Sequence, residues 1–161
     1  MVGTNRKPHI MPLEAFDAIC PEIARQEQAC CVVATLTFGV PPGRYVLREF
    51  YCTEFDCDCR RVLIHFFRSD NGRLSPAPLA VINFGWEKPR YYRKWCRVPD
   101  LWREMAGATL EAFANQGPDA EGFLALFQDS ARQPAFAGNF QRHYFRVKEM
   151  LAHGKWLPSS Y

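Results

Sequence analysis

Three of the seven cysteines of this chain lie within eight residues, at Cys52, Cys57 and Cys59. Thiols this close are typical of disulfide pairs, of redox catalysts or of ligands for a soft metal such as zinc. Each of these chemistries draws separate backbone segments to one point. The cluster therefore constrains the fold more than any other feature, and the rest of the sequence decides among the three chemistries.

The sequence around the cluster favours a metal. The N-terminus has no apolar run typical of a secretory signal, and no stretch approaches the roughly 18 apolar residues of a membrane helix. We therefore expect a cytoplasmic protein with no membrane partner. In a reducing compartment, an odd number of cysteines and the absence of a Cys-x-x-Cys spacing argue against disulfides and redox catalysis. We expect Cys20, Cys30 and Cys31, which lie among apolar residues, to be buried thiols.

Length and composition indicate one folded unit. The 161 residues are 48% hydrophobic, which suffices for one sizeable core, so we predict a single zinc-binding α+β domain over 1–161. The formal net charge of +3 neither requires nor excludes a nucleic-acid partner.

The first half of the chain reads as a helix followed by strands. Apolar residues at helical spacing predict a helix over 13–26, kinked or split at Pro21. Four segments rich in β-branched and aromatic residues follow, at 31–38, 44–52, 59–68 and 79–86. Turn sequences at 41–43 and 70–72 lie between them. Such short links favour an antiparallel four-stranded meander.

The second half returns to helical patterns. Pro99 is a plausible first helical residue, and the segment that it opens stops at Gly117. A short helix over 120–130 and a last helix from near Pro134, with Gly154 as its stop, complete the pattern. The predicted fold is α+β, with the meander packed against an N-terminal helix and a C-terminal group of about three helices.

The spacing of the cysteines specifies half of a metal site. Cys57 and Cys59 are two residues apart at the mouth of a strand, so both side chains point to the same face, with Cα atoms about 6.6 Å apart. Cys52 ends the preceding strand, and the four residues between can return the chain to place it opposite the pair. His65 shares the side-chain parity of Cys57 and Cys59, but it lies about 20 Å from Cys59 along the strand and is excluded as a ligand.

The fourth ligand stays open between His143, Cys96 and water. His143 falls on the apolar stripe of the last helix, where a polar ring needs a partner. The partner can be a carbonyl group as well as a metal. A shell of four protein ligands is normally structural, whereas an open position allows chemistry.

Acidic residues surround the cysteines. The segment 49–58 contains four acidic residues and no basic one. Glu54, Asp56 or Asp58 is a candidate general base for a metal-bound water, which makes a metal-dependent hydrolase the alternative function. The competing explanation is that these carboxylates solvate a hairpin tip or pair with Arg60 and Arg61.

A basic aromatic segment, residues 88–103, is the second candidate binding site. It contains six basic residues, one acidic residue and interleaved aromatic rings. The candidate contacts are Lys88, Arg90, Tyr91, Arg93, Lys94 and Arg97. Arginines with exposed rings bind phosphates and stack on bases, so one hypothesis is an RNA or single-stranded DNA binder. The commoner arrangement is a helix that buries Tyr92, Trp95 and Trp102 and leaves its charges in water.

The cysteine run also resembles that of a known group. Tyr51-Cys52, Cys57-Asp58-Cys59-Arg60, the 91–95 segment and Arg142-His143-Tyr144 together resemble a family of uncharacterised bacterial proteins with a YCxxxxCDCR motif. That family is similar to the N-terminal region of some SEC-C-motif metal-binding proteins, although the SEC-C motif itself does not occur in this sequence. The resemblance, over about residues 44–151, implies metal binding in a compact domain and favours His143 over Cys96. It carries no established reaction.

These observations combine into one leading hypothesis. Zinc is held by Cys52, Cys57, Cys59 and His143 in a structural Cys3His site, and this site stabilises a small cytoplasmic module that binds a protein or a nucleic acid.

Overall fold

The structure is a computed structural model that describes residues 12–156. The elements in chain order are β1 (Leu13–Ala15), α1 (Phe16–Ile19), α2 (Pro21–Glu27), β2 (Cys30–Val33), β3 (Gly43–Cys52), β4 (Arg61–Asp70), β5 (Arg73–Leu74), β6 (Ala80–Gly85), α3 (Pro89–Trp95), α4 (Trp102–Met105), β7 (Gly107–Leu110), α5 (Ala120–Ala131) and α6 (Pro134–Ala152). The predicted mixture of helices with an antiparallel sheet is confirmed. The sheet has seven strands in the described part of the chain, three more than predicted.

The sheet is built around two long central strands. Its main order is β1-β3-β4-β6-β7, and all of these pairs are antiparallel. β2 pairs with the beginning of β3, while β1 pairs with its end, so both short strands lie on the same side of β3. β4 and β5 are joined by Asn71 and Gly72, both at positive φ. Such a two-residue turn matches the right-handed twist of paired strands.

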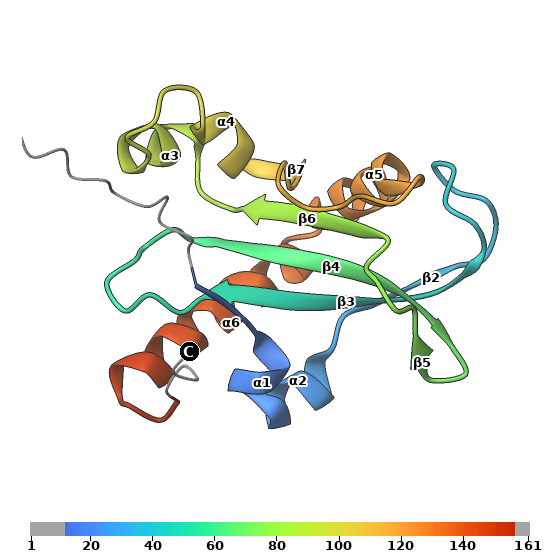
Figure 1. Ribbon diagram of the computed structural model, residues 1–161, viewed down its shortest axis with the longest axis horizontal. Helices are drawn as coiled ribbons and strands as arrows, with labels where there is room; N and C mark the ends of the chain where they lie inside the picture. Colours follow the sequence, from blue (N-terminus) through green and yellow to red (C-terminus); the bar gives the residue numbers. More distant parts are fainter. Residues whose placement is uncertain (1–11, 157–161) are drawn as a thin grey trace, which may run out of the picture.

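Helices α5 and α6 cover one face of the sheet (Figure 1). β3 and β4 direct Tyr45 and Phe66 to this face, where both rings contact Phe123 of α5 at centroid distances of 5.0 and 5.2 Å. On α6 the buried side chains are Phe140, His143, Tyr144 and Val147. This spacing of three and four residues places one stripe of the helix against the sheet. The core therefore lies between the sheet and these two helices.

Two predicted helical segments differ from the structure. The 13–26 segment is split at Pro21, as expected, but its first three residues form β1 and pair with the end of β3. The segment opened by Pro99 forms only the four-residue α4, and 107–110 form β7 beside β6. Pairing with the free edge of a strand outweighs local helix preference here. Gly85 permits this approach, because a Cβ there would lie 2.0 Å from the Met105 carbonyl oxygen.

Burial differs among the three cysteines that were expected to be buried thiols. Cys20 is buried, as predicted, whereas Cys30 is exposed and Cys31 is half-buried. The expectation of burial is wrong for Cys30 because β2 lies at the edge of the sheet. Within residues 12–156, no helix combines the length and the apolar character needed to cross a membrane.

Candidate metal centre

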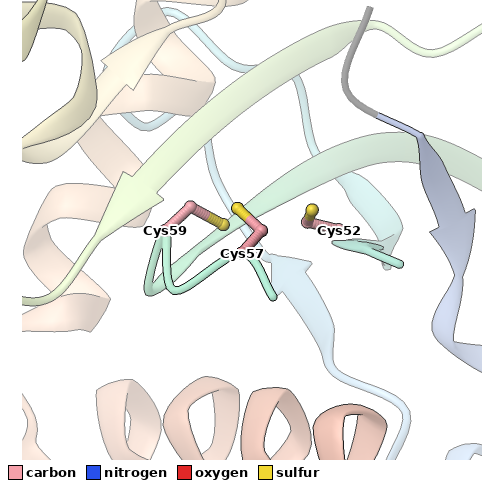
Figure 2. Close-up of side chains that lie close together, drawn as sticks. All are labelled: Cys52, Cys57 and Cys59. Atoms are coloured by element: carbon pink, nitrogen blue, oxygen red, sulfur yellow. The ribbon is translucent and has the colours of Figure 1, made fainter. Parts of the chain in front are cut away.

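The three clustered cysteines meet at the corner between β3 and β4. Cys52 is the last residue of β3, and Cys57 and Cys59 lie in the loop that leads to β4 at Arg61. Their sulfur atoms all lie within 4.8 Å of one another. Figure 2 shows the three side chains gathered at this corner. The cysteines are thus close enough to hold a metal ion, as their spacing predicts.

The dimensions suit a soft metal with little rearrangement. Zinc–thiolate bonds of about 2.3 Å in a tetrahedral shell place the sulfurs about 3.8 Å apart, so the sulfurs need to approach one another by at most about 1 Å. Cys52 and Cys59 are 1% and 0% exposed and belong to the hydrophobic core, whereas Cys57 is half-buried. The centre is therefore shielded from water on most sides.

The three sulfurs share their protons unequally. Hydrogen bonds from the Cys57 and Cys59 thiols lower the pKa of Cys52 to about 3, helped by the Glu54 backbone and the charge of Lys148. The same contacts with Cys52 raise the pKa of both Cys57 and Cys59. The first proton of the cluster is therefore lost most easily from Cys52. A bound cation favours the loss of the two remaining protons, as metal binding to cysteine requires.

Side chains from α3 and α6 hold the loop in place. The loop between β3 and β4 contains no helix or strand, so its carbonyl groups need other donors. The Lys148 ammonium donates to the carbonyls of Cys52 (3.3 Å) and Glu54 (2.9 Å), and the Tyr144 hydroxyl donates to that of Cys57 (3.4 Å). The hydroxyls of Tyr91 and Tyr92 donate to the carbonyls of Asp58 and Arg60, the second at 2.7 Å. Five loop carbonyls are thus bound from two sides.

Arg60 closes the loop in an unusual backbone conformation. Its φ is 47°, in the left-handed region that non-glycine residues seldom adopt. The guanidinium pairs with Asp58 and with Glu87, each at 3.0 Å, and lies over the Tyr91 ring at 5.0 Å. These contacts fix the turn that leads from Cys59 into β4.

His143 does not join the cysteines, and this prediction requires correction. The ring is 2% exposed, and both of its nitrogens contact carboxylates: Nδ1 lies 2.8 Å from Glu49 Oε2, and Nε2 lies 2.7 Å from Glu27 Oε2. Its face stacks on Phe16 at 4.2 Å. The rotation of α6 directs His143 toward α1 and α2. The next residue, Tyr144, is the one that reaches the cysteine loop.

Cys96 and His65 lie elsewhere as well. Cys96 follows α3, and its thiol contacts the Val98 carbonyl at 3.6 Å. The His65 ring stacks on Phe50 at 4.2 Å, and burial together with Arg48 lowers its pKa to about 4. His65 therefore packs against a ring and is no ligand of the cluster, in line with its exclusion from the sequence. Residues 12–156 thus contribute three sulfur atoms to the candidate centre and no fourth ligand.

Asp58, one of the three candidate bases near the centre, is held by other contacts. Asp58 pairs with Arg60 at 3.0 Å and accepts a hydrogen bond from the Tyr144 hydroxyl at 3.3 Å. The hydrogen bond from Arg60 lowers the pKa of Asp58 despite partial burial. Arg61 pairs instead with Glu111 at 3.9 Å. Asp58 therefore fixes the loop, which is the alternative that the sequence left open for it beside general base catalysis.

The basic aromatic segment 88–103 places its rings against the protein. Tyr92 is fully buried, and the guanidinium carbons of Arg93 and Arg103 lie 4.2 and 4.9 Å from the centroid of the Trp102 ring. The basic side chains of the segment are exposed. This agrees with the packing arrangement for Tyr92 and for the exposed charges, whereas Trp95 and Trp102 are only half-buried; nucleic-acid binding by this segment stays a prediction.

Sequence reasoning missed the residues that hold the loop. Tyr144 and Lys148 are four residues apart on α6, and the Lys148 ammonium lies 5.4 Å from the Tyr144 ring centroid. Residues at this spacing share one helix face. That spacing was an available signal, but nothing in the local sequence indicates that this face meets the cysteines.

No family model, curated protein or solved structure matches this chain. The resemblance to the bacterial family with the YCxxxxCDCR motif therefore stays a prediction, and the function must be argued from the geometry of the cysteine corner.

Proposed function

We propose that this chain is a small zinc-binding protein in which Cys52, Cys57 and Cys59 hold the ion as a structural staple. The observation that carries the proposal is the convergence of three sulfurs within 4.8 Å on a loop fastened by both α3 and α6. A cation at this point ties the β3–β4 corner together. Structural zinc contributes directly to folding free energy, because the unfolded chain does not present a formed site.

A structural role fits the surroundings better than a catalytic one. Two of the three sulfurs are buried in the core. The nearby carboxylate of Asp58 is engaged by Arg60 and Tyr144. A general base must instead be free to accept a proton from a metal-bound water.

Metal analysis tests the proposal directly. Protein purified without added zinc should contain about one equivalent of zinc per chain, and Cys57→Ser should contain less than about a tenth. Cys96→Ser is the matched control, because Cys96 is also a half-buried loop cysteine but lies apart from the cluster. We expect it to keep its zinc. The thermal melting midpoint of Cys57→Ser should be lower than that of the wild type. In a chain of this size, each kcal/mol of unfolding free energy that is lost lowers the midpoint by about 2–4 °C.

Two results would contradict the proposal. Purified wild-type protein that contains no zinc would show that there is no zinc site, and a melting midpoint that does not change when zinc is lost would show that the zinc is not structural.

Cobalt substitution determines the fourth ligand. Cobalt in a thiolate site gives charge-transfer bands from sulfur and visible bands that depend on coordination geometry. Added imidazole should change the visible bands if the fourth ligand is an exchangeable water. A spectrum insensitive to imidazole indicates four protein ligands and a closed site, and closed sites are normally structural.

A further inference from the structure

A second surface, far from the clustered cysteines 52, 57 and 59, is formed by the edge strand β2 and the turn after it. Residues 28–43 contain no charged side chain. Natural proteins usually protect an edge strand with charges, proline or a covering element, because its unpaired backbone groups can pair with another chain. β2 has no charge or proline, and its Cys30 and Val32 are exposed.

The free backbone groups of β2 can be assigned from the register. The Leu47 N–H donates to the Ala29 carbonyl at 3.0 Å, so Ala29 and Leu47 form a hydrogen-bonded pair. Antiparallel ladders alternate, and the register of β2 on β3 therefore directs the polar backbone groups of Cys31 and Val33 toward β3. The N–H and C=O groups of Cys30 and Val32 point away from the sheet. They form a short template for another strand.

Apolar side chains continue this edge. Val32, Leu36 and Phe38 are 69%, 70% and 56% exposed. Phe38 has a φ of 50° in a two-residue turn closed by mutual hydrogen bonds between Thr37 and Val40. A left-handed conformation is strained for a bulky residue, and such strain is retained where the surroundings enforce it.

The turn is held from behind by α5. Val40 is fully buried, and a Cβ at Gly122 would lie 2.4 Å from the Phe38 carbonyl oxygen. This close packing leaves the Phe38 ring at the surface. The apolar tip is therefore a fixed part of the fold.

A cavity beside β2 supplies a place for a side chain. Its volume is about 320 Å³, and it lies between β2, the central strands and the two long helices. Its walls include Cys31, Val32, Phe66, Leu126, Phe127 and Phe136. Strand addition uses two components: backbone hydrogen bonds along an edge, and pockets that accept alternate side chains of the added strand. Both are present here.

We infer that this edge is a docking site for an extended, apolar segment of a partner protein. The segment adds a strand beside Cys30–Val33 and places a large apolar side chain in the adjacent cavity. The absence of charge over 28–43 fits an uncharged partner segment. Leu36 and Phe38 extend the contact beyond the strand.

A second copy of this chain fits the site less well. Antiparallel pairing of two β2 strands about Val32 brings Cys31 of one copy opposite Val33 of the other. These side chains are small, and neither supplies the large group that a cavity of about 320 Å³ accepts.

Peptide binding to full-length, isotopically labelled protein tests the inference. The probe is a capped peptide, Lys-Thr-Leu-Thr-Leu-Thr-Leu-Lys, and its counterpart carries N-methyl groups on alternate residues and cannot complete the ladder. We expect saturable binding of the parent peptide and slower hydrogen exchange at the amides of Cys30 and Val32. The N-methylated peptide should bind at least about tenfold more weakly, because backbone hydrogen bonds are lost.

Variants separate strand addition from apolar adsorption. Val32→Pro removes an outward N–H without removing a bond to β3, which edge strands tolerate. Val32→Lys adds a protecting charge to the edge. Both should weaken peptide binding at least about tenfold. Phe113→Lys is the control, because Phe113 is 91% exposed and does not line the cavity; it should bind as the wild type does.

Three results overturn the inference. Equal binding of the parent and N-methylated peptides shows apolar adsorption, and absence of binding at about 1 mM peptide shows no usable site. A dimer of the free protein that Val32→Pro converts to a monomer shows that a second copy occupies the edge.

Discussion

One buried residue of α6, His143, links this helix to α2 and to the sheet. His143 bridges Glu27 of α2 and Glu49 of β3, and Arg142 also pairs with Glu27 at 2.8 Å. The Tyr51 hydroxyl donates to Glu49 at 2.6 Å. Both ring nitrogens of His143 face carboxyl groups, and an imidazolium donates to both, whereas a neutral ring donates to only one. Four elements of the fold thus meet at one side chain, since Phe16 of α1 stacks on the same ring.

This network predicts a pH-dependent stability. Burial lowers the pKa of His143, but the hydrogen bonds and charges of Glu49 and Glu27 outweigh it, and the net shift is upward. A raised pKa gives a contribution that is complete below the unfolded value of 6.5 and is lost as pH rises through the folded pKa. The hydrogen bond from His143 lowers the pKa of Glu27, whose contribution is lost as pH falls below 4.5. The network should therefore stabilise most between these values.

Urea unfolding across this range provides the measurement. His143→Gln should cost about 3–5 kcal/mol near pH 6, because the buried Glu49 carboxylate loses its charged partner. The difference between wild type and variant should shrink as pH rises from 6.5 through the folded pKa of His143 and should change no further above it. A constant difference from pH 6 to pH 9 would show that His143 is neutral in the folded protein. Comparing the two proteins at each pH cancels the titration of the cysteines, which both contain.

The residue scale also shows what sequence can predict about a site. The cysteine spacing is local and sufficed to predict that the three thiols meet, although Cys57 and Cys59 lie in the loop before β4 and not on a strand as expected. The fourth position depended on the rotation of a helix more than 80 residues away in the sequence. One residue on α6 separates His143, which meets carboxylates, from Tyr144, which meets the loop. Periodicity identifies the buried stripe but does not identify the partner of each residue within it.

At the scale of elements, α3 and α6 act as clamps on the cysteine loop. Tyr92 of α3 and Lys148 of α6 bind loop carbonyls from opposite sides. Groups that support metal ligands typically contribute a factor of about 10–100 to metal affinity, because they hold the ligands in the geometry that the ion requires. We therefore expect the side chains of α3 and α6 to contribute to the affinity for the metal, although none of them is a ligand.

Removing one clamp should weaken zinc binding without unfolding the protein. We expect Tyr92→Phe and Lys148→Met each to lower zinc affinity by about tenfold, measured by competition with a chromophoric chelator at fixed pH. Tyr45→Phe is the matched control, since its hydroxyl donates to the Pro41 carbonyl at 2.8 Å, away from the loop. Equal affinities in all four proteins would show that the loop holds its shape alone.

The success of prediction varied among elements for a physical reason. α5 and α6 were located closely because Pro134 and the apolar spacing are local signals. β4 was predicted two residues too early at each end, at 59–68, and the turn after it followed from Asn71-Gly72, but β5 was not predicted. β1 and β7 were missed because each is a three- or four-residue strand that forms only by pairing with an existing edge. Such pairing depends on tertiary structure and leaves little trace in the local sequence.

At the scale of the whole molecule, β3 joins the two proposed sites. Its final residue is Cys52, and its first four residues pair with β2. The six residue-to-residue steps from Val46 to Cys52 span about 20 Å of extended chain. The metal centre is fastened by α3 and α6, whereas the docking edge is supported by the turn at 37–40 and by α5. The two sites therefore share a strand but few supporting contacts.

This separation predicts that the sites act independently. Changes more than about 7–10 Å apart with no shared partners usually add in free energy. Zinc removal, or Cys57→Ser, should therefore leave the affinity for the Lys-Thr-Leu-Thr-Leu-Thr-Leu-Lys peptide unchanged within about twofold, and the stability losses of Cys57→Ser and Val32→Pro should add in the double variant. Titration of the peptide into zinc-loaded and zinc-free protein, at a temperature where both are folded, measures the coupling. A larger change in affinity would mean that β3 transmits the state of its cysteine end to its docking end, and the metal would then regulate partner binding as well as stabilise the fold.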